Sequence, residues 1–307
     1  MGRAKGIEMG FDLDTLISKV DGLEELSRPF TKDEVELVIK QMPTDRASGP
    51  DGFTGLFLKK CWSILKPDFM QLVKDFYDGK CDLECLNSSL ITLTPKKLSP
   101  EVVGDFRPIS LTNTCLKFLT KLLANRLQKV IVKCIHKNQY GFLRCCSIQD
   151  CLARCFEYIH QCKAPKRPII LLKLDFTKAF DTIEHESILR MLQCKGFGNR
   201  WNGWVNGLLS SGSSSVLLNG VPGQQFMCHT VVRQGDPLSP LLFVIAVDLL
   251  QSVVNEMCSR NILTLPIPTS SNDYPMVQYT DDTLIVLPAV DAQILAFKEI
   301  LAIFLSL

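Results

Sequence analysis

The sequence has little net charge, no long uninterrupted apolar run, and no internal repeat or low-complexity segment. Its 34 basic and 32 acidic residues leave a formal net charge of +2, so composition alone does not indicate a nucleic-acid-binding protein. The longest apolar stretch, Pro237–Leu250, is interrupted by Ser239 and Asp248, and we interpret it as a buried helix and not as a membrane span. Residues 1–29 are polar and lack the apolar run of a secretory signal, so we interpret them as a linker or the remnant of an upstream segment.

The composition is otherwise that of a folded globular protein, with 46% hydrophobic and 21% charged residues. Thirteen cysteines without a secretory signal predict free thiols in a reducing, intracellular compartment and not a disulfide framework. Cys151, Cys155, His160 and Cys162 do not have the spacing of a structural zinc site, and the three cysteines fall on one helical stripe. We interpret these cysteines as small core residues.

Hydrophobic periodicity and turn residues predict a mixture of helices and strands. Thr31 and Glu34 form a capping-box pattern at the start of the first long helix. The predicted helices are 31–41, 54–78 with an interruption at Pro67, 112–133, 147–162, 185–194, 201–210, 239–259 and 292–305. The predicted strands are 89–93, 109–111, 168–176, 214–219, 224–231, 276–279 and 283–287, and strand 168–176 is expected to be buried on both faces.

Acidic residues occupy positions that a purely structural sequence would avoid. Asp281 and Asp282 lie between two short apolar strands, where adjacent carboxylates repel each other and are costly to bury without a cation. Asp175 ends the apolar strand before them. If these strands are neighbours in one sheet, the three carboxylates converge at one edge and suit Mg²⁺, which prefers oxygen ligands. The alternative interpretation is a solvated turn and a capping aspartate.

Three further patterns accompany these aspartates. Phe180 follows Asp175 by five residues, and its alternative role is core packing. The segment Arg233–Pro240 opens the apolar helix, and its alternative role is an N-terminal cap with prolines. Arg107 stands before a rigid turn in the segment Asp105–Ser110, and its alternative role is a surface ion pair.

The order and spacing of eight segments across about residues 30–290 resemble the reverse transcriptases of non-LTR (LINE-type) retrotransposons, particularly those of plants. The segments are ASGPDGFTGLFLKKCW, ITLTPKK, DFRPISL, LLANRL, NQYGFL, LLKLDFTKAFD, VVRQGDPLSPLLF and VQYTDDTLIV. The resemblance implies an α+β fold of the right-hand polymerase type, with fingers and an antiparallel palm sheet with packed helices. It implies that residues 30–167 form the fingers-rich part of the domain. Residues 168–307 would then form the palm with a fingers/palm insertion, truncated before the thumb.

The resemblance also implies roles for single residues. Asp175, Asp281 and Asp282 match the family's metal-binding catalytic aspartates, which hold two Mg²⁺ ions, with Mn²⁺ as an alternative. Phe180 matches the family's residue under the incoming sugar, and Gln234 matches a residue of the nucleotide pocket. Arg107 and Lys96 match residues that bind the triphosphate. One departure stands beside the metal ligands, because the family usually has alanine at the position of Thr280.

The implied reaction is RNA-directed DNA synthesis, in which a primer 3′-hydroxyl attacks a deoxynucleoside triphosphate. The expected partners are an RNA template, a DNA primer and deoxynucleotides, with no membrane, and the endonuclease and thumb segments of a longer polyprotein lie outside this chain. The family's life cycle implies the nucleus. A catalytically inactive remnant that at most binds nucleic acid is the alternative. A nucleotide cyclase on a related palm is disfavoured, because Arg107, Phe180 and Gln234 fit a polymerase pocket.

Overall fold

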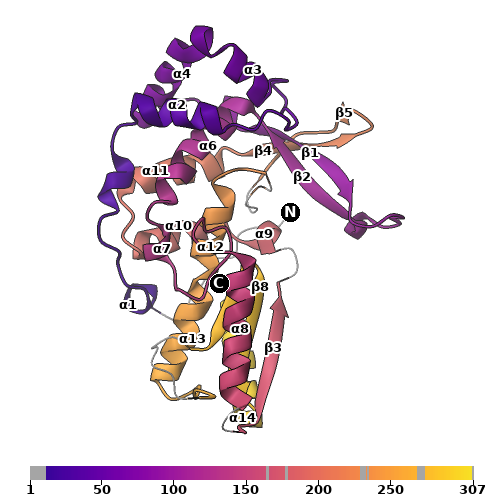
Figure 1. Cartoon of the computed structure of the whole chain (residues 1–307). Helices are drawn as coiled ribbons and strands as arrows, with labels where there is room; N and C mark the ends of the chain where they lie inside the picture. Colours follow the sequence, from indigo (N-terminus) through magenta and orange to yellow (C-terminus); the bar gives the residue numbers. More distant parts are fainter. Residues whose placement is uncertain are drawn as a thin grey trace.

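In the computed structural model the chain forms two β-sheets with helices packed against them (Figure 1). The structure describes residues 12–163, 166–176, 179–228, 233, 235–267 and 274–305. A five-stranded sheet lies in the upper part of Figure 1, and a three-stranded sheet lies in the lower part. The predicted α+β class, with an antiparallel sheet and packed helices, is confirmed.

The upper part combines segments that are far apart in the chain. Its sheet has the order β2-β1-β4-β5, with β6 also paired to β4, and β1 runs parallel to β4. The strands are β1 (Ser88–Pro95), β2 (Phe106–Thr112), β4 (Ser213–Leu218), β5 (Val221–Pro222) and β6 (Phe226–Met227). The helices around it are α2 (Lys32–Gln41), α3 (Gly55–Lys60), α4 (Trp62–Tyr77), α5 (Leu83–Leu86), α6 (Thr114–Leu127), α10 (His185–Cys194) and α11 (Asn199–Ser210).

A turn in the GPDG segment attaches the N-terminal helices to this sheet. The carboxylate of Asp51 accepts a hydrogen bond from the backbone N–H of Thr114 at 2.7 Å, at the start of α6. The backbone N–H of Asp51 donates to the side-chain oxygen of Asn113 at 3.0 Å. A Cβ on Gly49 would lie 2.3 Å from the carbonyl oxygen of Thr112, so only glycine fits there. This segment therefore has a structural role.

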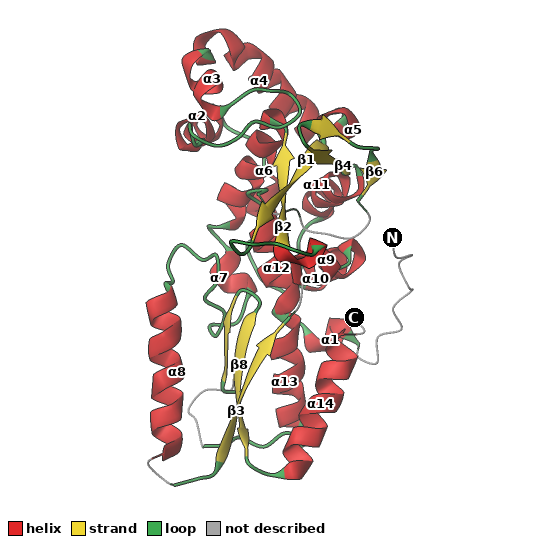
Figure 2. Ribbon diagram, turned by 90° about the vertical axis from the view of Figure 1, so that its right-hand side faces the viewer, coloured by secondary structure: helices red, strands yellow, loops and turns green. Residues whose placement is uncertain are grey.

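The lower part is a three-stranded antiparallel sheet between helices (Figure 2). Its order is β3-β8-β7, where β3 is Ile169–Asp175, β8 is Asp282–Pro288 and β7 is Met276–Tyr279. Helix α8 (Ile148–Lys163) covers one face, and α13 (Leu249–Ser259) and α14 (Asp291–Leu305) cover the other. Val286 on β8 packs with Cys151 and Cys162 of α8, whereas Ile285 and Leu287 join the main core. The strand therefore alternates between two apolar faces.

The most apolar helix lies at the centre of the molecule. Helix α12 (Ser239–Val247) and α13 form a stretch from Ser239 to Ser259 that is long and apolar enough to cross a membrane, but 83% of its most apolar window is buried inside the fold. Its Asp248 is completely buried and contacts Lys195 and His136. The interpretation of this stretch as a buried helix is confirmed.

Most predicted elements are present, with several differences. Of the predicted strand 224–231 only β6 is a strand, and residues 229–231 lie outside the described residues. The break in helix 54–78 falls at Cys61, whose ψ of 11° leaves the helical range, and Pro67 lies inside α4. Helix 112–133 ends at Leu127 and is followed by the short α7 (Ile131–Cys134). The predicted burial of strand 168–176 on both faces is wrong, because β3 is an edge strand and Leu171 is exposed. The remaining short elements are α1 (Leu13–Leu16), η1 (Glu24–Ser27), η2 (Val103–Asp105) and α9 (Ala179–Thr182).

Residues 12–29, expected as part of a linker, pack against the body of the protein. Leu13, Ile17, Leu23 and Leu26 are each at most 5% exposed and belong to the main core. These side chains lie in or next to the short elements α1 and η1 and show no long periodic pattern in the sequence.

Candidate active site

The three predicted metal-binding aspartates meet at one edge of the three-stranded sheet. Strands β3 and β8 pair antiparallel with Asp175 opposite Asp282, and β7 and β8 form a hairpin with Tyr279 opposite Asp282. The hairpin turn consists of Thr280 and Asp281. The predicted convergence of the backbones of Asp175, Asp281 and Asp282 therefore matches the register of the sheet.

The side chains at this edge are open to solvent. Asp175 and Asp282 are exposed and Asp281 is half-buried. Among the residues that the structure describes, no three acidic, histidine or cysteine side chains close around a common point. The donor set nevertheless fits a hard cation, because it consists of carboxylate oxygens with free coordination positions on an accessible edge. Two metal ions at these aspartates remain a prediction.

One cation of the protein already contacts this edge. The amine of Lys173 lies 2.9 Å from a carboxylate oxygen of Asp282, and both side chains are more than half exposed. The hydrogen bond to Asp282 raises the pKa of the Lys173 amine. Lys173 and Asp175 lie two residues apart on β3, so both point to the same face of the sheet. A divalent cation bound by Asp282 would therefore compete with Lys173.

The turn before the aspartate pair has an unusual backbone. Thr280 has a φ of +60°, in the left-handed region that β-branched residues rarely adopt. Its hydroxyl lies 2.6 Å from a carboxylate oxygen of Asp281 and donates a hydrogen bond to it. The residue that departs from the family pattern is thus in direct contact with a predicted metal ligand.

The aromatic residue Phe180 lies in α9, shortly after β3. Its ring stacks on Phe243 of α12, with centroids 4.1 Å apart and an angle of 15° between the planes. Phe142 meets the same ring edge-on at 6.1 Å, is 43% exposed, and has a φ of +61°. Phe180 therefore has the packing contact that its alternative interpretation requires, with an exposed aromatic beside it. Its role below a sugar stays a prediction.

The two predicted triphosphate-binding residues lie on the β1–β2 hairpin. Arg107 on β2 pairs with Thr94 on β1 and its side chain is exposed. The amine of Lys96 donates to the carbonyl oxygen of Gly104 at 3.0 Å, within the hairpin tip. The carboxylate of Asp105 forms its ion pair with Lys97 at 2.9 Å. The alternative role of Arg107 in a surface ion pair stays a prediction.

The segment around Arg233 is held in the interior. The buried Arg233 guanidinium donates to the side-chain oxygen of Asn87, and Gly212 leaves the space that this guanidinium occupies. Asp236 accepts hydrogen bonds from the backbone N–H groups of Leu238 at 2.7 Å and Ser239 at 3.2 Å, as a cap of α12. Burial raises the pKa of Asp236. The predicted Gln234 lies outside the described residues.

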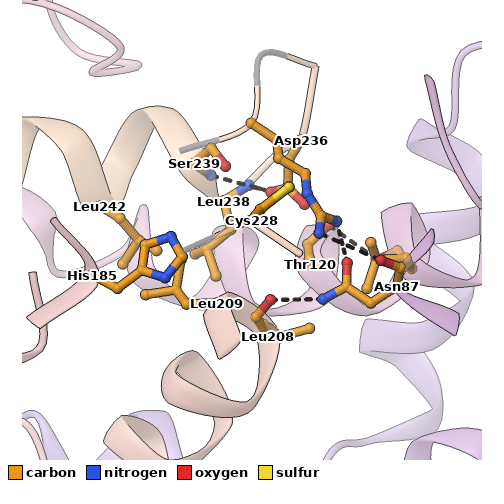
Figure 3. A pocket seen from close by; sticks show the side chains of 12 residues that line it. Asn87, Thr120, His185, Leu208, Leu209, Cys228, Asp236, Leu238, Ser239 and Leu242 are labelled. Atoms are coloured by element: carbon orange, nitrogen blue, oxygen red, sulfur yellow. Dashed lines mark hydrogen bonds between the residues drawn. The ribbon is translucent and has the colours of Figure 1, made fainter. Parts of the chain in front are cut away.

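A cavity beside this segment is too small for a nucleotide. Figure 3 shows its lining, with the amide of Asn87 donating to the carbonyl oxygen of Leu208 at 2.7 Å. His185, Thr120 and Cys228 also line it. The cavity volume is about 30 Å³, which is room for about one water molecule. The nucleotide site that the resemblance implies therefore does not lie in this cavity.

Two residues that were not predicted to belong to the site contact the turn of Thr280 and Asp281. Gln139 and Gly141 lie against Thr280. Both belong to the NQYGFL segment, which the resemblance includes but to which it assigns no role. The available signal in the sequence was a glutamine two residues before a glycine within this segment.

The fold and the carboxylate edge have the arrangement expected of the palm of a nucleic-acid polymerase. Comparison with known proteins agrees: residues 94–306 match the model of the family described as reverse transcriptase (RNA-dependent DNA polymerase). This match covers more than half of the 307 residues. The chain belongs to the reverse transcriptase family.

Curated relatives come from mobile elements of animals. The uncharacterized 149 kDa protein of transposon TX1 from Xenopus laevis is 28% identical over 266 residues, which is 86% of this chain and 20% of that protein. A Pol polyprotein of the retrotransposable element R2 from Nasonia vitripennis is 28% identical over 76% of this chain and 22% of its own length. The RNA-directed DNA polymerase of the mobile element jockey from Drosophila melanogaster is 23% identical over 83% of this chain and 27% of its own length. The chain thus spans about a fifth to a quarter of these relatives.

Proposed function

We propose that this chain is the fingers-and-palm core of an RNA-directed DNA polymerase from a non-LTR (LINE-type) retrotransposon. The pairing of Asp175 with Asp282 across β3 and β8, with Asp281 in the adjoining turn, is the observation that supports this proposal most. The residues of the eight segments resemble those of plant retrotransposons most, so we propose an element of the plant type. The relatives named above support the broader group of retrotransposable elements.

In this proposal the substrates are an RNA template, a DNA primer and deoxynucleoside triphosphates. Asp175, Asp281 and Asp282 would hold two Mg²⁺ ions, with Mn²⁺ as an alternative. When bound, two such ions lower the pKa of the attacking hydroxyl and stabilise the leaving pyrophosphate. The side chains of the three aspartates supply the negative charge that keeps both ions at the primer terminus.

The other predicted residues act on the nucleotide. Phe180 would lie under the incoming sugar and exclude a 2′-hydroxyl, and Gln234 would line the pocket. Arg107 and Lys96 lie on the exposed β1–β2 hairpin, where charged donors suit the phosphate oxygens of the triphosphate. We assign a fingers-rich part to residues 30–167 and a palm with a fingers/palm insertion to residues 168–307. We also propose that the protein acts in the nucleus.

Primer extension tests this function. Purified 1–307 is incubated with an RNA template, a DNA primer, deoxynucleotides and Mg²⁺, beside Asp281→Asn and the matched control Asp291→Asn. Asp291 is an exposed aspartate that begins α14, outside the carboxylate edge. Loss of a metal ligand removes several kcal/mol of transition-state stabilisation, so we expect extension by Asp281→Asn to fall by about 10³-fold or more.

The control keeps the comparison specific. Asp291→Asn is expected to extend the primer like the unchanged chain. Equal extension by the unchanged chain and Asp281→Asn would contradict the assignment of the metal site. No extension by any of the three proteins, with all of them folded, would favour the alternative of an inactive remnant.

A further inference from the structure

A loop segment extends the catalytic hairpin on the side opposite β3. Gln139 forms a parallel bridge with Gln278 of β7. The backbone N–H of Tyr140 donates to the carbonyl oxygen of Gln278 at 2.9 Å. The backbone N–H of Gln278 donates to the carbonyl oxygen of Asn138 at 2.8 Å. Residues 138–141 therefore pair with the free edge of β7 and end beside the turn of the hairpin.

The side chain of Gln139 holds this turn through its backbone. Gln139 is 1% exposed. Its side-chain oxygen accepts hydrogen bonds from the backbone N–H groups of Gly141 at 2.8 Å and Thr280 at 3.2 Å. Its side-chain nitrogen donates to the carbonyl oxygen of Thr280 at 3.5 Å. One amide group thus satisfies both backbone polar groups of Thr280.

Thr280 needs such support because of its conformation. A threonine at φ +60° crowds its branched Cβ against the backbone, so this geometry persists only where the surroundings impose it. Gly141 contributes by leaving space: a Cβ there would lie 2.4 Å from the nitrogen of Thr280 and 2.5 Å from its methyl carbon. The loop therefore contacts the turn through hydrogen bonds and through close packing.

We propose that Gln139 is a positioning residue that fixes the direction of Asp281 by holding Thr280 in the left-handed conformation. Asp281 directly follows Thr280 and accepts its hydroxyl at 2.6 Å, so a change in the Thr280 backbone reorients this carboxylate. Gly141 shares the role by its lack of a side chain. The inference rests on the proposed metal site, because it assigns to Gln139 an effect on metal binding.

The test compares Gln139 of the loop with Gln278 of the hairpin. Gln139→Met keeps the length of the side chain and removes its hydrogen bonds. Gln278→Met is the matched control, because Gln278 is also 1% exposed but its side chain bonds to Thr283 at 3.4 Å and not to the turn. Hydrogen exchange of residues 276–285 reports the turn itself, and the loss of the free Mn²⁺ signal in electron paramagnetic resonance reports metal affinity.

We expect Gln139→Met to accelerate exchange at the Thr280 amide and to raise the Kd for Mn²⁺ by about tenfold, as is typical of lost support for metal ligands. Gln278→Met is expected to leave both unchanged, with a similar shift of the thermal midpoint in the two variants. Unchanged exchange and Mn²⁺ affinity in Gln139→Met would overturn the proposal. Equal effects in both variants would also overturn it, because they would show general loosening of the hairpin.

Two additions separate this proposal from the metal site itself. If Asp281→Asn binds Mn²⁺ like the unchanged chain, the proposed metal site is wrong, and exchange at Thr280 alone decides the role of Gln139. If Gln139→Met does not fold, Gly141→Ala takes its place, with Gly203→Ala as control because a Cβ there meets no atom within 4 Å. Faster exchange at Thr280 in Gly141→Ala alone supports the proposal that the loop holds the turn. The same exchange rate in both variants overturns this proposal.

Discussion

Two lysine–aspartate pairs of similar length have opposite surroundings. Lys173 and Asp282 lie 2.9 Å apart at the sheet edge, with side chains 67% and 56% exposed. Lys195 and Asp248 lie 2.8 Å apart at the junction of α12 and α13, with side chains 5% and 0% exposed. His136 also binds Asp248, through its ring nitrogen at 2.9 Å and its backbone N–H at 2.8 Å.

The difference separates a structural carboxylate from one available to a ligand. Burial makes a charge costly, so Asp248 is tolerable only with partners on its oxygens. Water screens the exposed pair, and its aspartate keeps oxygens free for a cation. An aspartate with many protein partners therefore indicates architecture, whereas exposed aspartates gathered at one sheet edge indicate a site.

The largest effect on stability is expected from Lys195→Met. The substitution leaves the Asp248 carboxylate buried without its ammonium partner, and we expect a loss of about 3–5 kcal/mol in the free energy of unfolding. Urea denaturation followed by circular dichroism measures this loss. The double variant Lys195→Met, Asp248→Leu should recover part of it, because no unpaired charge remains. A loss below about 1 kcal/mol in the single variant would show that the pair is not the structural element inferred here.

The second prediction concerns pH. Burial acts to raise the pKa of Asp248, but Lys195 and His136 outweigh burial, so its pKa lies below the ordinary value of 3.8. A carboxyl with a lowered pKa in the folded state stabilises the protein fully above its unfolded value, and this stabilisation is lost as pH falls through the folded pKa. The unfolding free energy of the unchanged chain should therefore fall below pH 3.8 more steeply than that of Asp248→Asn. Parallel curves would refute the linkage.

Asp236 sharpens the contrast with a smaller effect. It is also buried, but burial raises its pKa, so its ionised form costs stability above its folded pKa and this cost disappears as pH falls. In Asp236→Asn the amide oxygen can still accept from the backbone of Leu238 and Ser239. We expect the free energy of unfolding at neutral pH to change by less than about 1 kcal/mol, in contrast to Asp248→Asn. Denaturant unfolding of Asp236→Asn and Asp248→Asn measures this difference. Similar large losses of unfolding free energy in the two variants would contradict the prediction.

The smallest effect on stability is expected from Lys173→Met. Both side chains of its ion pair are exposed, so the unfolding midpoint should stay the same at low and high salt. Removal of the competing amine should instead lower the Kd of Mn²⁺ at the carboxylate edge. Mn²⁺ titration monitored by electron paramagnetic resonance measures this, and Lys298→Met provides an exposed lysine control on α14. An unchanged Kd would mean that Lys173 does not compete for Asp282.

The elements of the candidate site could be predicted from sequence because they are local. The hairpin of Asp281 and Asp282 follows from two short apolar strands around a polar turn, and the strand that ends in Asp175 follows from one apolar run. Their alignment needed the assumption that the strands are neighbours, and the register of β3 with β8 confirms it. The prediction failed for the burial of β3, whose alternate residues Leu171, Lys173 and Asp175 are exposed on one face, because an apolar run does not show whether both faces of a strand are covered.

The sequence by itself determined most of the helices and strands, the family that the chain resembles, and the aspartates that end or join short apolar strands. Only the tertiary structure decided what these segments meet: β1 beside β4, Lys195 and His136 on Asp248, and Gln139 on the turn at Thr280. Local periodicity and turn chemistry act within a few residues and specify an apolar face or a bend. The partner of that face is selected by packing between segments far apart in the chain, from 53 residues for Lys195 and Asp248 to 141 residues for Gln139 and Thr280. There the burial of each polar group must be compensated by a bond from elsewhere in the chain.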